Sequence, residues 1–480
     1  MNYVKIIIAL NFLSFLIQPA SSQNNHATVK VFAKGSADAK VYLTTMFKDY
    51  FYKGNTMIYQ LDKVAESVEI QIQIEKQQMV VLTNFFRTAK LIVAPNDAIE
   101  IHFNADDSLK IVGDNAEGQE LLNKITSDDT RFRFEELDVK TDVAGRLMIL
   151  EEMKISDSNK IQQLLNQESV TSSFAKALQK ESDLYYKLLW STDLFFTCRP
   201  LIYADTSQKV DPEFVKAWNE LYHNLDESWA KSPLFPMLMY RYNDFLSIGE
   251  IESNNTTKVP YYIIINNRLR SKLKGPLREY AWANNIISGL ENNEYEKAWI
   301  DDFVDFQKEF PSSPLQGKLK NEIQKVNDYH QRIANADSSI IISDHAKSYK
   351  SIKELMLSMK GKYYYVDLWA TWCGPCKAEL QYSIKMHDKL EEIGFTPIYL
   401  SLDQDKDDAK WKEMVKGYPL KGINLRAGKE MNSLLNQEIP NFNGIPRYLI
   451  VNKEGEVVEW NAKRPSDGIQ LINQLKELKN

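Results

Sequence analysis

The sequence has few cysteines, no excess of positive charge and no long apolar run after its first residues. Three cysteines among 480 residues are too few for a fold held together by disulfides. A net charge of −6 argues against the basic surface that nucleic-acid binding requires. No later stretch approaches the roughly 20 apolar residues of a membrane-spanning helix. The composition is that of a globular protein, 44% apolar and 26% charged, and the length predicts about two to four domains.

The first 22 residues have the features of a secretory signal peptide. Lys5 supplies the positive charge, residues 6–17 form a short apolar core, and residues 20–22 are small enough for cleavage. We therefore expect an exported, soluble protein with no membrane-spanning segment once residues 1–22 are removed. An uncleaved anchor remains the alternative.

Hydrophobic periodicity divides the remaining chain into three parts. Alternation of apolar and polar residues predicts an antiparallel β domain over residues 23–114. The period becomes helical over residues 115–336, which predicts an all-α domain. A strand–helix–strand order followed by a hairpin and a helix predicts an α/β domain over residues 337–480.

The motif Cys373-Gly374-Pro375-Cys376 follows a very apolar segment that is expected to be a buried strand. Two intervening residues let both sulfurs close a disulfide across one helical turn. If a helix begins at Cys373, its free backbone N–H groups and its positive dipole end favour the thiolate of this residue. Cys376, one turn inside, would be shielded and suited to resolving a mixed disulfide. Pro375 can begin the helix without the loss of a hydrogen-bond donor.

The sequence favours a redox role for this cysteine pair over a structural role. A disulfide that closes so small a loop would stabilise the chain by roughly 2 kcal/mol, a modest gain for a protein of this size. A structural zinc site needs four ligands, and the sequence has no second cysteine pair. No metal site is therefore predicted.

The string from Val366 to Cys376, with Gly361-Lys362 before it, is close to a thioredoxin active-site sequence. With Glu379, Asp403 and residues 444–446, it resembles the thioredoxin-fold domain of the TlpA/ResA-like thiol–disulfide oxidoreductases. This resemblance covers about residues 340–480. Two further strings, Ala94-Pro95-Asn96-Asp97 and Val112-Gly113-Asp114-Asn115-Ala116, resemble more weakly the N-terminal regions of TlpA-like proteins from Bacteroidetes.

The resemblance implies a substrate-binding surface around the cysteine pair. Ile445–Pro446 is expected to be a cis peptide that faces the sulfurs. Its backbone would accept an extended substrate segment, and the proline ring would keep metal away. Gly374 and Pro375 are expected to belong to this surface, and Trp372 to shape it because it stands beside the attacking sulfur.

Two acids are expected to move the proton of the resolving thiol. Glu379 lies three residues after Cys376, within one helical turn. Asp367 lies six residues before Cys373, where thioredoxin itself carries a buried aspartate. Two acids near one thiol pair would titrate together. Lys377 is expected to be exposed.

Three other residues carry narrower expectations. Gln381 stands where the family often has proline, so the resemblance does not carry the usual helix kink over to this chain. Arg447 stands where threonine is common, which predicts a bias toward substrates with acidic neighbours. Cys198, after an aromatic run, is expected to be a buried thiol, with mixed-disulfide chemistry as the alternative.

The sequence therefore predicts an exported, periplasmic thiol–disulfide oxidoreductase that acts as a reductase through Cys373 and Cys376. It needs no cofactor beyond this dithiol. Its expected partners are disulfide-containing exported proteins and, as the family suggests, a membrane protein that relays electrons to it. The alternative is a binding or scaffold protein in which the thioredoxin-like domain serves as a docking module.

Overall fold

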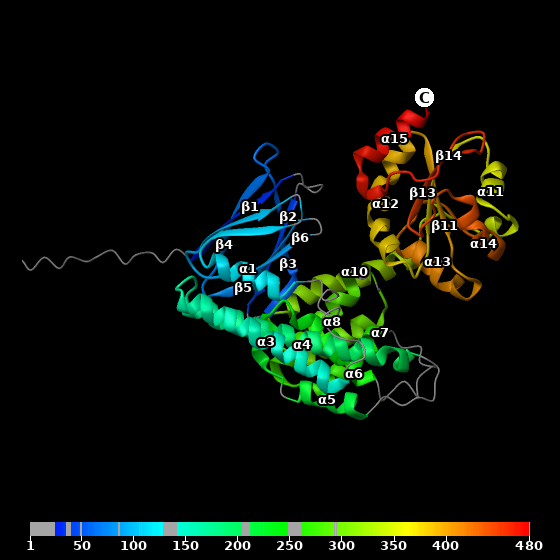
Figure 1. Ribbon diagram of the computed structural model, residues 1–480. Helices are drawn as coiled ribbons and strands as arrows, with labels where there is room; N and C mark the ends of the chain where they lie inside the picture. Colours follow the sequence, from blue (N-terminus) through cyan, green and yellow to red (C-terminus); the bar gives the residue numbers. More distant parts are fainter. Residues whose placement is uncertain are drawn as a thin grey trace, which may run out of the picture. The chain divides into compact units, whose positions relative to one another are not determined.

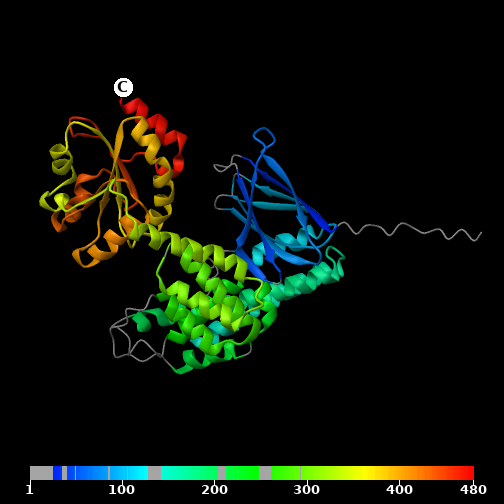
Figure 2. The same ribbon diagram turned by 180° about the vertical axis from the view of Figure 1, so that it is seen from behind.

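The computed structural model describes residues 25–34, 40–48, 50–84, 87–104, 106, 108–127, 142–203, 212–223, 225–247, 261–291, 293 and 295–479. The expected signal peptide and the side chain of Cys198 lie outside the described residues. Contacts divide the chain into two compact units, Met1–Tyr242 and Asn243–Asn480. The predicted order of strands, helices and a final α/β domain is confirmed (Figures 1 and 2). The boundaries of the three predicted domains stay predictions.

The first unit begins with eight strands in two four-stranded sheets, ordered β4-β1-β7-β8 and β3-β2-β5-β6. Their bounds are β1 His26–Ala33, β2 Lys40–Phe47, β3 Tyr50–Gln60, β4 Ser67–Gln73, β5 Gln78–Asn84, β6 Arg87–Val93, β7 Ala98–Phe103 and β8 Leu109–Gly113. The pair β1–β7 is parallel, whereas the other paired strands of these two sheets are antiparallel. The predicted antiparallel domain thus contains one parallel pair.

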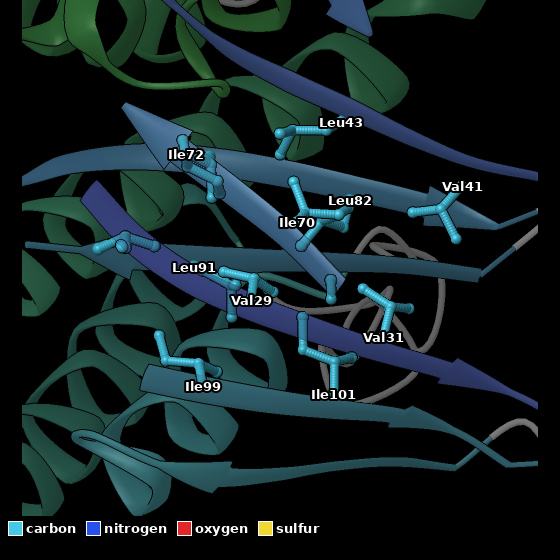
Figure 3. Close-up of a cluster of buried hydrophobic side chains, with 14 of the residues drawn as sticks. Val29, Val31, Val41, Leu43, Ile70, Ile72, Leu82, Leu91, Ile99 and Ile101 are labelled. Carbon is cyan, nitrogen blue, oxygen red and sulfur yellow. The ribbon is translucent and has the colours of Figure 1, made fainter. Parts of the chain in front are cut away.

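The core of this domain contains alternate side chains of both sheets. Val29 and Val31 of β1 are fully buried together with Val41 of β2 and Leu82 of β5. Figure 3 shows these residues among the labelled side chains of one cluster. Because successive residues of a strand point to opposite faces, the alternation in sequence becomes one apolar and one polar face.

Helix α1, Ala116–Ile125, covers the edge strand β6. The side chain of Gln119 accepts a hydrogen bond from the backbone of Ile92 at 3.1 Å and donates one to its carbonyl at 2.6 Å. Asn123 makes the same two kinds of contact with Lys90, each at 2.8 Å. These amide side chains satisfy backbone groups that an edge strand leaves unpaired.

The helices that follow are α3 Val143–Asn166, α4 Ser172–Tyr203, α5 Pro212–Tyr222, the 3₁₀ turn η1 Glu227–Lys231 and α6 Phe235–Ser247, and the boundary between the two units falls within α6. Arg146 of α3 and Asp193 of α4 form a buried ion pair with an N–O distance of 2.5 Å. Both side chains are nearly inaccessible, so each compensates the charge of the other.

The second unit begins with helices α7 Tyr261–Lys272, α8 Gly275–Glu291, α9 Ala298–Glu309 and α10 Gln316–Ala334. Helix α10 packs on α13, Asp408–Gly417, of the α/β domain. The ring of Tyr329 lies so close to Gly417 that a Cβ atom there would approach it to 2.1 Å. Arg332 donates a hydrogen bond to the Gly417 carbonyl at 2.7 Å. These contacts join the last helix of the predicted all-α region to the α/β domain.

The α/β domain has one six-stranded sheet, ordered β14-β13-β10-β11-β12-β9. Its strands are β9 Ile340–Ser343, β10 Tyr363–Trp369, β11 Phe395–Ser401, β12 Gly422–Arg426, β13 Arg447–Val451 and β14 Val457–Glu459. Its other helices are α11 Ile352–Ser358, α12 Gly374–Glu392, α14 Lys429–Glu438 and α15 Ile469–Lys479, and its 3₁₀ turns are η2 His345–Ser348, η3 Asp405–Asp407 and η4 Pro465–Asp467.

Strand β10 lies in the interior of this sheet and all its residues after Tyr363 are buried. Helices α11 and α14 cover one face of the sheet, and α12 and α15 cover the other (Figures 1 and 2). A strand covered on both faces is largely apolar, which explains the run before the cysteine motif, where Asp367 is the charged residue. Among the described helices, none has the length and apolarity required to cross a bilayer.

Candidate active site

The two cysteines lie at the N-terminus of α12, directly after the central strand. Cys373 is the N-cap residue of this helix, and Pro375 lies in its first turn. The two sulfurs form a disulfide with an S–S distance of 1.98 Å. The backbone N–H of Cys376 points at the sulfur of Cys373, with an N–S distance of 3.2 Å. This geometry places the free N–H groups of the helix beside Cys373, as the sequence predicts.

The two sulfurs differ in their surroundings. Cys376 is 1% exposed and Cys373 is 5% exposed in the disulfide form. Their neighbours Trp372, Gly374 and Pro375 are exposed, and Trp372 presents 65% of its surface. A partner can therefore approach the pair from the side of these three residues.

The loop before β13 completes this surface. The Ile445–Pro446 peptide bond is cis, so this expectation is confirmed. The carbonyl oxygen of Ile445 lies 3.7 Å from the sulfur of Cys373. Tertiary folding thus brings together residues 372–376 and 445–446, which are about 70 positions apart in sequence.

Asp403 holds the start of the active-site loop. Its carboxylate accepts hydrogen bonds from the backbone N–H of Thr371 at 3.0 Å and from the Thr371 hydroxyl at 2.8 Å. It also accepts one from the hydroxyl of Ser401 at 2.7 Å. Asp403 was part of the sequence resemblance, but no role followed from it. Its place directly after a parallel strand was the available signal, because the C-terminal ends of parallel strands meet at one sheet edge.

Asp367 is buried in the sheet below the cysteine pair and is 3% exposed. Neither of its carboxylate oxygens has a hydrogen-bond partner among the described residues. It pairs with Tyr399 on one neighbouring strand and with Tyr448 on the other. Burial raises the pKa of Asp367 well above its ordinary value, and the negative charge of Glu379 raises it further. Proton binding to this carboxylate is therefore more favourable than for an ordinary aspartate.

Glu379 lies on the buried side of α12 and is 8% exposed. Its two carboxylate oxygens accept hydrogen bonds from Ser466, one from the hydroxyl at 2.8 Å and one from the backbone N–H at 3.1 Å. Turn η4, which carries Ser466, thereby fixes the orientation of this acid. The sequence singled out Glu379 and Asp367 but could not show that Ser466, 87 positions later, holds Glu379.

The expectation of an exposed Lys377 is wrong, because this side chain is only 4% exposed. It lines a cavity of about 240 Å³ together with Tyr295, Glu296 and Glu413. Residues of the connection between α8 and α9 therefore lie beside Lys377. This contact could not be foreseen from the local sequence of α12.

The same connection reaches the next turn of α12. The side chain of Gln381 donates a hydrogen bond to the side-chain oxygen of Asn293 at 3.0 Å, and the Tyr295 hydroxyl donates to the same oxygen at 3.0 Å. Trp369 is fully buried in the adjoining cluster. Within the described ranges, no three histidine, cysteine or acidic side chains are grouped so that they could bind a metal ion.

Comparison with known proteins identifies relatives of the α/β domain. Residues 361–457 match the family model described as thioredoxin-like. The thiol-disulfide oxidoreductase ResA of Bacillus thuringiensis subsp. konkukian is 33% identical over 120 residues, which are 25% of this chain and 65% of the relative. Thioredoxin-1 of Drosophila melanogaster is 23% identical over 137 residues, which are 28% of this chain and 96% of the relative.

A solved structure gives a match of similar extent. The thioredoxin domain of a thiol-disulfide oxidoreductase from Bacteroides vulgatus shows 27% identity, covering 26% of this chain and 83% of that chain, with a TM-score of 0.22. The chain spans 65% of the length of the first curated ResA relatives. These likenesses each cover about a quarter of the chain.

Proposed function

We propose that this chain, whose C-terminal domain belongs to the thioredoxin-like family, is a thiol–disulfide oxidoreductase that reduces disulfides of other proteins. The observation that carries the proposal is the Cys373–Cys376 disulfide at the start of α12, beside the exposed Trp372 and the Ile445–Pro446 loop. A helix N-terminus stabilises the thiolate of Cys373, and the neighbouring surface is open to an extended polypeptide.

The thiol–disulfide exchange proceeds in two steps. In the reduced protein the Cys373 thiolate attacks a substrate disulfide, forms a mixed disulfide and releases one substrate thiolate. The Cys376 thiol then loses its proton, and its thiolate attacks the sulfur of Cys373 in the mixed disulfide. The second substrate thiolate leaves as the Cys373–Cys376 disulfide forms. The substrate has gained two electrons, and two protons neutralise its thiolates.

Asp367 and Glu379 are proposed to handle the proton of Cys376. Asp367 has a raised pKa because it is buried, and Glu379 is held by Ser466 at the same helix. A carboxylate with a raised pKa is a stronger base than an ordinary one and takes a thiol proton more readily. The two acids are proposed to act together, since the negative charge of Glu379 raises the pKa of Asp367.

Reduction is the proposed direction. Gly374 and Pro375 separate the cysteines, and neither supplies the imidazole that stabilises the reduced thiolate in strongly oxidising relatives. A reductase should therefore show a midpoint potential below roughly −200 mV, whereas a value near roughly −120 mV would assign the oxidising direction. Equilibration with glutathione buffers measures this potential.

Export to the periplasm is proposed from residues 1–22. In that compartment the substrates would be exported proteins with disulfides, and a membrane protein would have to return electrons to the pair. The dithiol itself would be the redox group, with no further cofactor.

The proposal is tested with the full chain and reduced thiols. Incubated with insulin, a disulfide-containing probe, the variant Cys376→Ser should accumulate a covalent complex through Cys373. The matched variant Cys373→Ser retains the other thiol and should accumulate none. Mass spectrometry of non-reduced samples detects the complex. Equal amounts of complex in both variants, or none in either, would contradict the proposed order of attack.

A binding or scaffold role is the second candidate. The β sandwich of the first unit has its own buried core and contains no residue of the cysteine site. If binding were the main function, a Cys373→Ser, Cys376→Ser double variant would keep the phenotype of the wild-type protein in its host. Loss of the phenotype with normal protein levels would support catalysis instead.

A further inference from the structure

A polar cavity lies beside the loop that carries Pro446. It has a volume of about 650 Å³. Its walls are the loop before β13 and the segment after β14, and the lining includes Pro446, Arg447, Tyr448, Trp460 and Arg464. The loop residue Ile445, whose carbonyl lies 3.7 Å from the sulfur of Cys373, directly precedes Pro446. The cavity therefore adjoins the surface where a substrate segment would lie.

Arg447 brings a buried positive charge to this cavity. The side chain is 6% exposed. Its guanidinium donates hydrogen bonds to the carbonyl of Asn441 at 2.8 Å and to the side-chain oxygen of Asn443 at 3.1 Å. A third contact, to the carbonyl of Trp460, measures 3.5 Å. All three partners are neutral, and no carboxylate of the described residues forms an ion pair with this guanidinium.

Arg464 adds a second positive charge to the lining. Its side chain is exposed, and it forms no ion pair with a described carboxylate. Glu459 is the acidic residue of the lining, and its carboxylate accepts a hydrogen bond from the backbone N–H of Asn461 at 2.7 Å. The two arginines outnumber this acid, so the cavity carries a net positive charge.

Other polar groups of the cavity also suit an anionic ligand group. Asn441 and Asn443 line it from the loop, and Asn461 from the opposite segment. Arginine with neighbouring amide groups is a common arrangement for carboxylate recognition.

We infer that this cavity is a specificity subsite that accepts an acidic side chain of a protein substrate while the adjoining cysteine of that substrate reacts with Cys373. The inference rests on the proposed oxidoreductase function and adds a substrate class to it. Arg447 holds the loop and supplies the buried charge, whereas Arg464 meets the carboxylate from the solvent side. An acidic residue near the substrate disulfide raises the rate of reduction, because its carboxylate and the arginines of the cavity compensate each other's charge.

The test uses the full-length reduced protein and a set of short disulfide peptides. Each peptide carries glutamate, glutamine or lysine at one position that flanks the attacked cysteine, and kcat/KM is measured for each position. At one position or more, the glutamate peptide should react at least about fivefold faster than the glutamine peptide, with lysine slowest. Arg464→Gln should bring the glutamate-to-glutamine ratio close to one. The neighbouring variant Lys463→Gln, which removes a charge outside the lining, should retain the ratio.

Each other outcome has a definite meaning. Equal rates for all three peptides at every position would overturn the subsite while the oxidoreductase function stands. A preference that survives in Arg464→Gln, or that Lys463→Gln abolishes equally, would also overturn it, because the preference would then come from the general surface charge. If no peptide were reduced at all, the proposed function itself would fail.

Discussion

Asp403 binds Thr371 through two kinds of hydrogen bond, one to its backbone N–H at 3.0 Å and one to its hydroxyl at 2.8 Å. Thr371 stands two positions before Cys373 and follows the central strand β10. A buried carboxylate at the end of the neighbouring strand thereby fixes the loop that leads into α12. The placement of the cysteine pair depends on this contact, although Asp403 itself lies outside the motif.

We predict that Asp403→Asn destabilises the protein by about 1–3 kcal/mol, the usual penalty when buried hydrogen-bonding groups lose a partner. The NH₂ group of the asparagine side chain cannot accept a hydrogen bond. The variant therefore cannot accept all the bonds that Asp403 accepts from Thr371 and Ser401. Urea unfolding of the oxidised protein measures the change in the free energy of unfolding. Asp388→Asn, at an exposed position of α12, is the control and should leave it unchanged. Equal effects of the two changes would show that Asp403 does not hold the loop.

We predict that Asp367→Asn stabilises the protein at neutral pH by roughly 1–3 kcal/mol, because the neutral amide avoids the burial of a charge. Burial raises the pKa of Asp367 above its ordinary value in the folded state. The contribution of Asp367 to the stability of the wild type is therefore most favourable below its ordinary pKa and is lost as the pH rises through the raised pKa. The gain in the variant should shrink as the pH is lowered toward 4. Unfolding curves at several pH values measure it, and a gain that grows in acid would refute the assignment.

We predict that Glu379→Gln lowers the pKa of Asp367 but leaves it above the ordinary value. Burial is the main cause of the raised pKa and persists in the variant, whereas the charge of Glu379 is removed. Carbon-13 NMR of the aspartate carboxyl in the oxidised protein follows the titration. Glu391→Gln removes an exposed acid of the same helix and serves as control. If both variants shifted the pKa of Asp367 equally, the two acids would not be specifically coupled.

We predict that Gly417→Ala destabilises the protein by about 1–3 kcal/mol, the usual cost of overpacking. The new Cβ would lie 2.1 Å from the ring of Tyr329, so α10 would have to move away from α13. Gly317→Ala in α10 is the matched control, since its Cβ would meet no atom within 4 Å. That change should stabilise the helix by roughly 0.5–1 kcal/mol. Thermal unfolding of both variants separates contact from helix propensity, and similar shifts in both would contradict the packing.

We predict a coupling of about 0.5–1.5 kcal/mol between Asn293 and Gln381, which hydrogen-bond at 3.0 Å. Asn293→Ala, Gln381→Ala and the double variant form the double-mutant cycle, with urea unfolding as the measurement. The double variant should be less destabilised than the sum of the single changes. Strict additivity would mean that the connection between α8 and α9 is not anchored to α12 by this contact.

The sequence by itself determined the classes of structure and the position of the cysteine pair, because these depend on local patterns. Alternation with period two produced the sandwich core around Val29 and Val31, and a segment that is apolar except for Asp367 produced the central strand β10. The two-residue spacing of Cys373 and Cys376 at a helix start allowed their disulfide. The family resemblance added the cis Ile445–Pro446 bond, which local sequence alone does not specify.

Only the tertiary structure decided which distant groups surround the pair. Ser466 orients Glu379, Asp403 holds Thr371, and the connection between α8 and α9 lies beside Lys377. Sheet order or helix packing brings the residues of each contact together. The residue types alone do not specify which residues pair. The parallel partnership of β1 and β7 has the same origin, since either strand could pair in either direction by its pattern alone. The local sequence of a strand or helix is compatible with many packing partners. Long-range packing selects one of them.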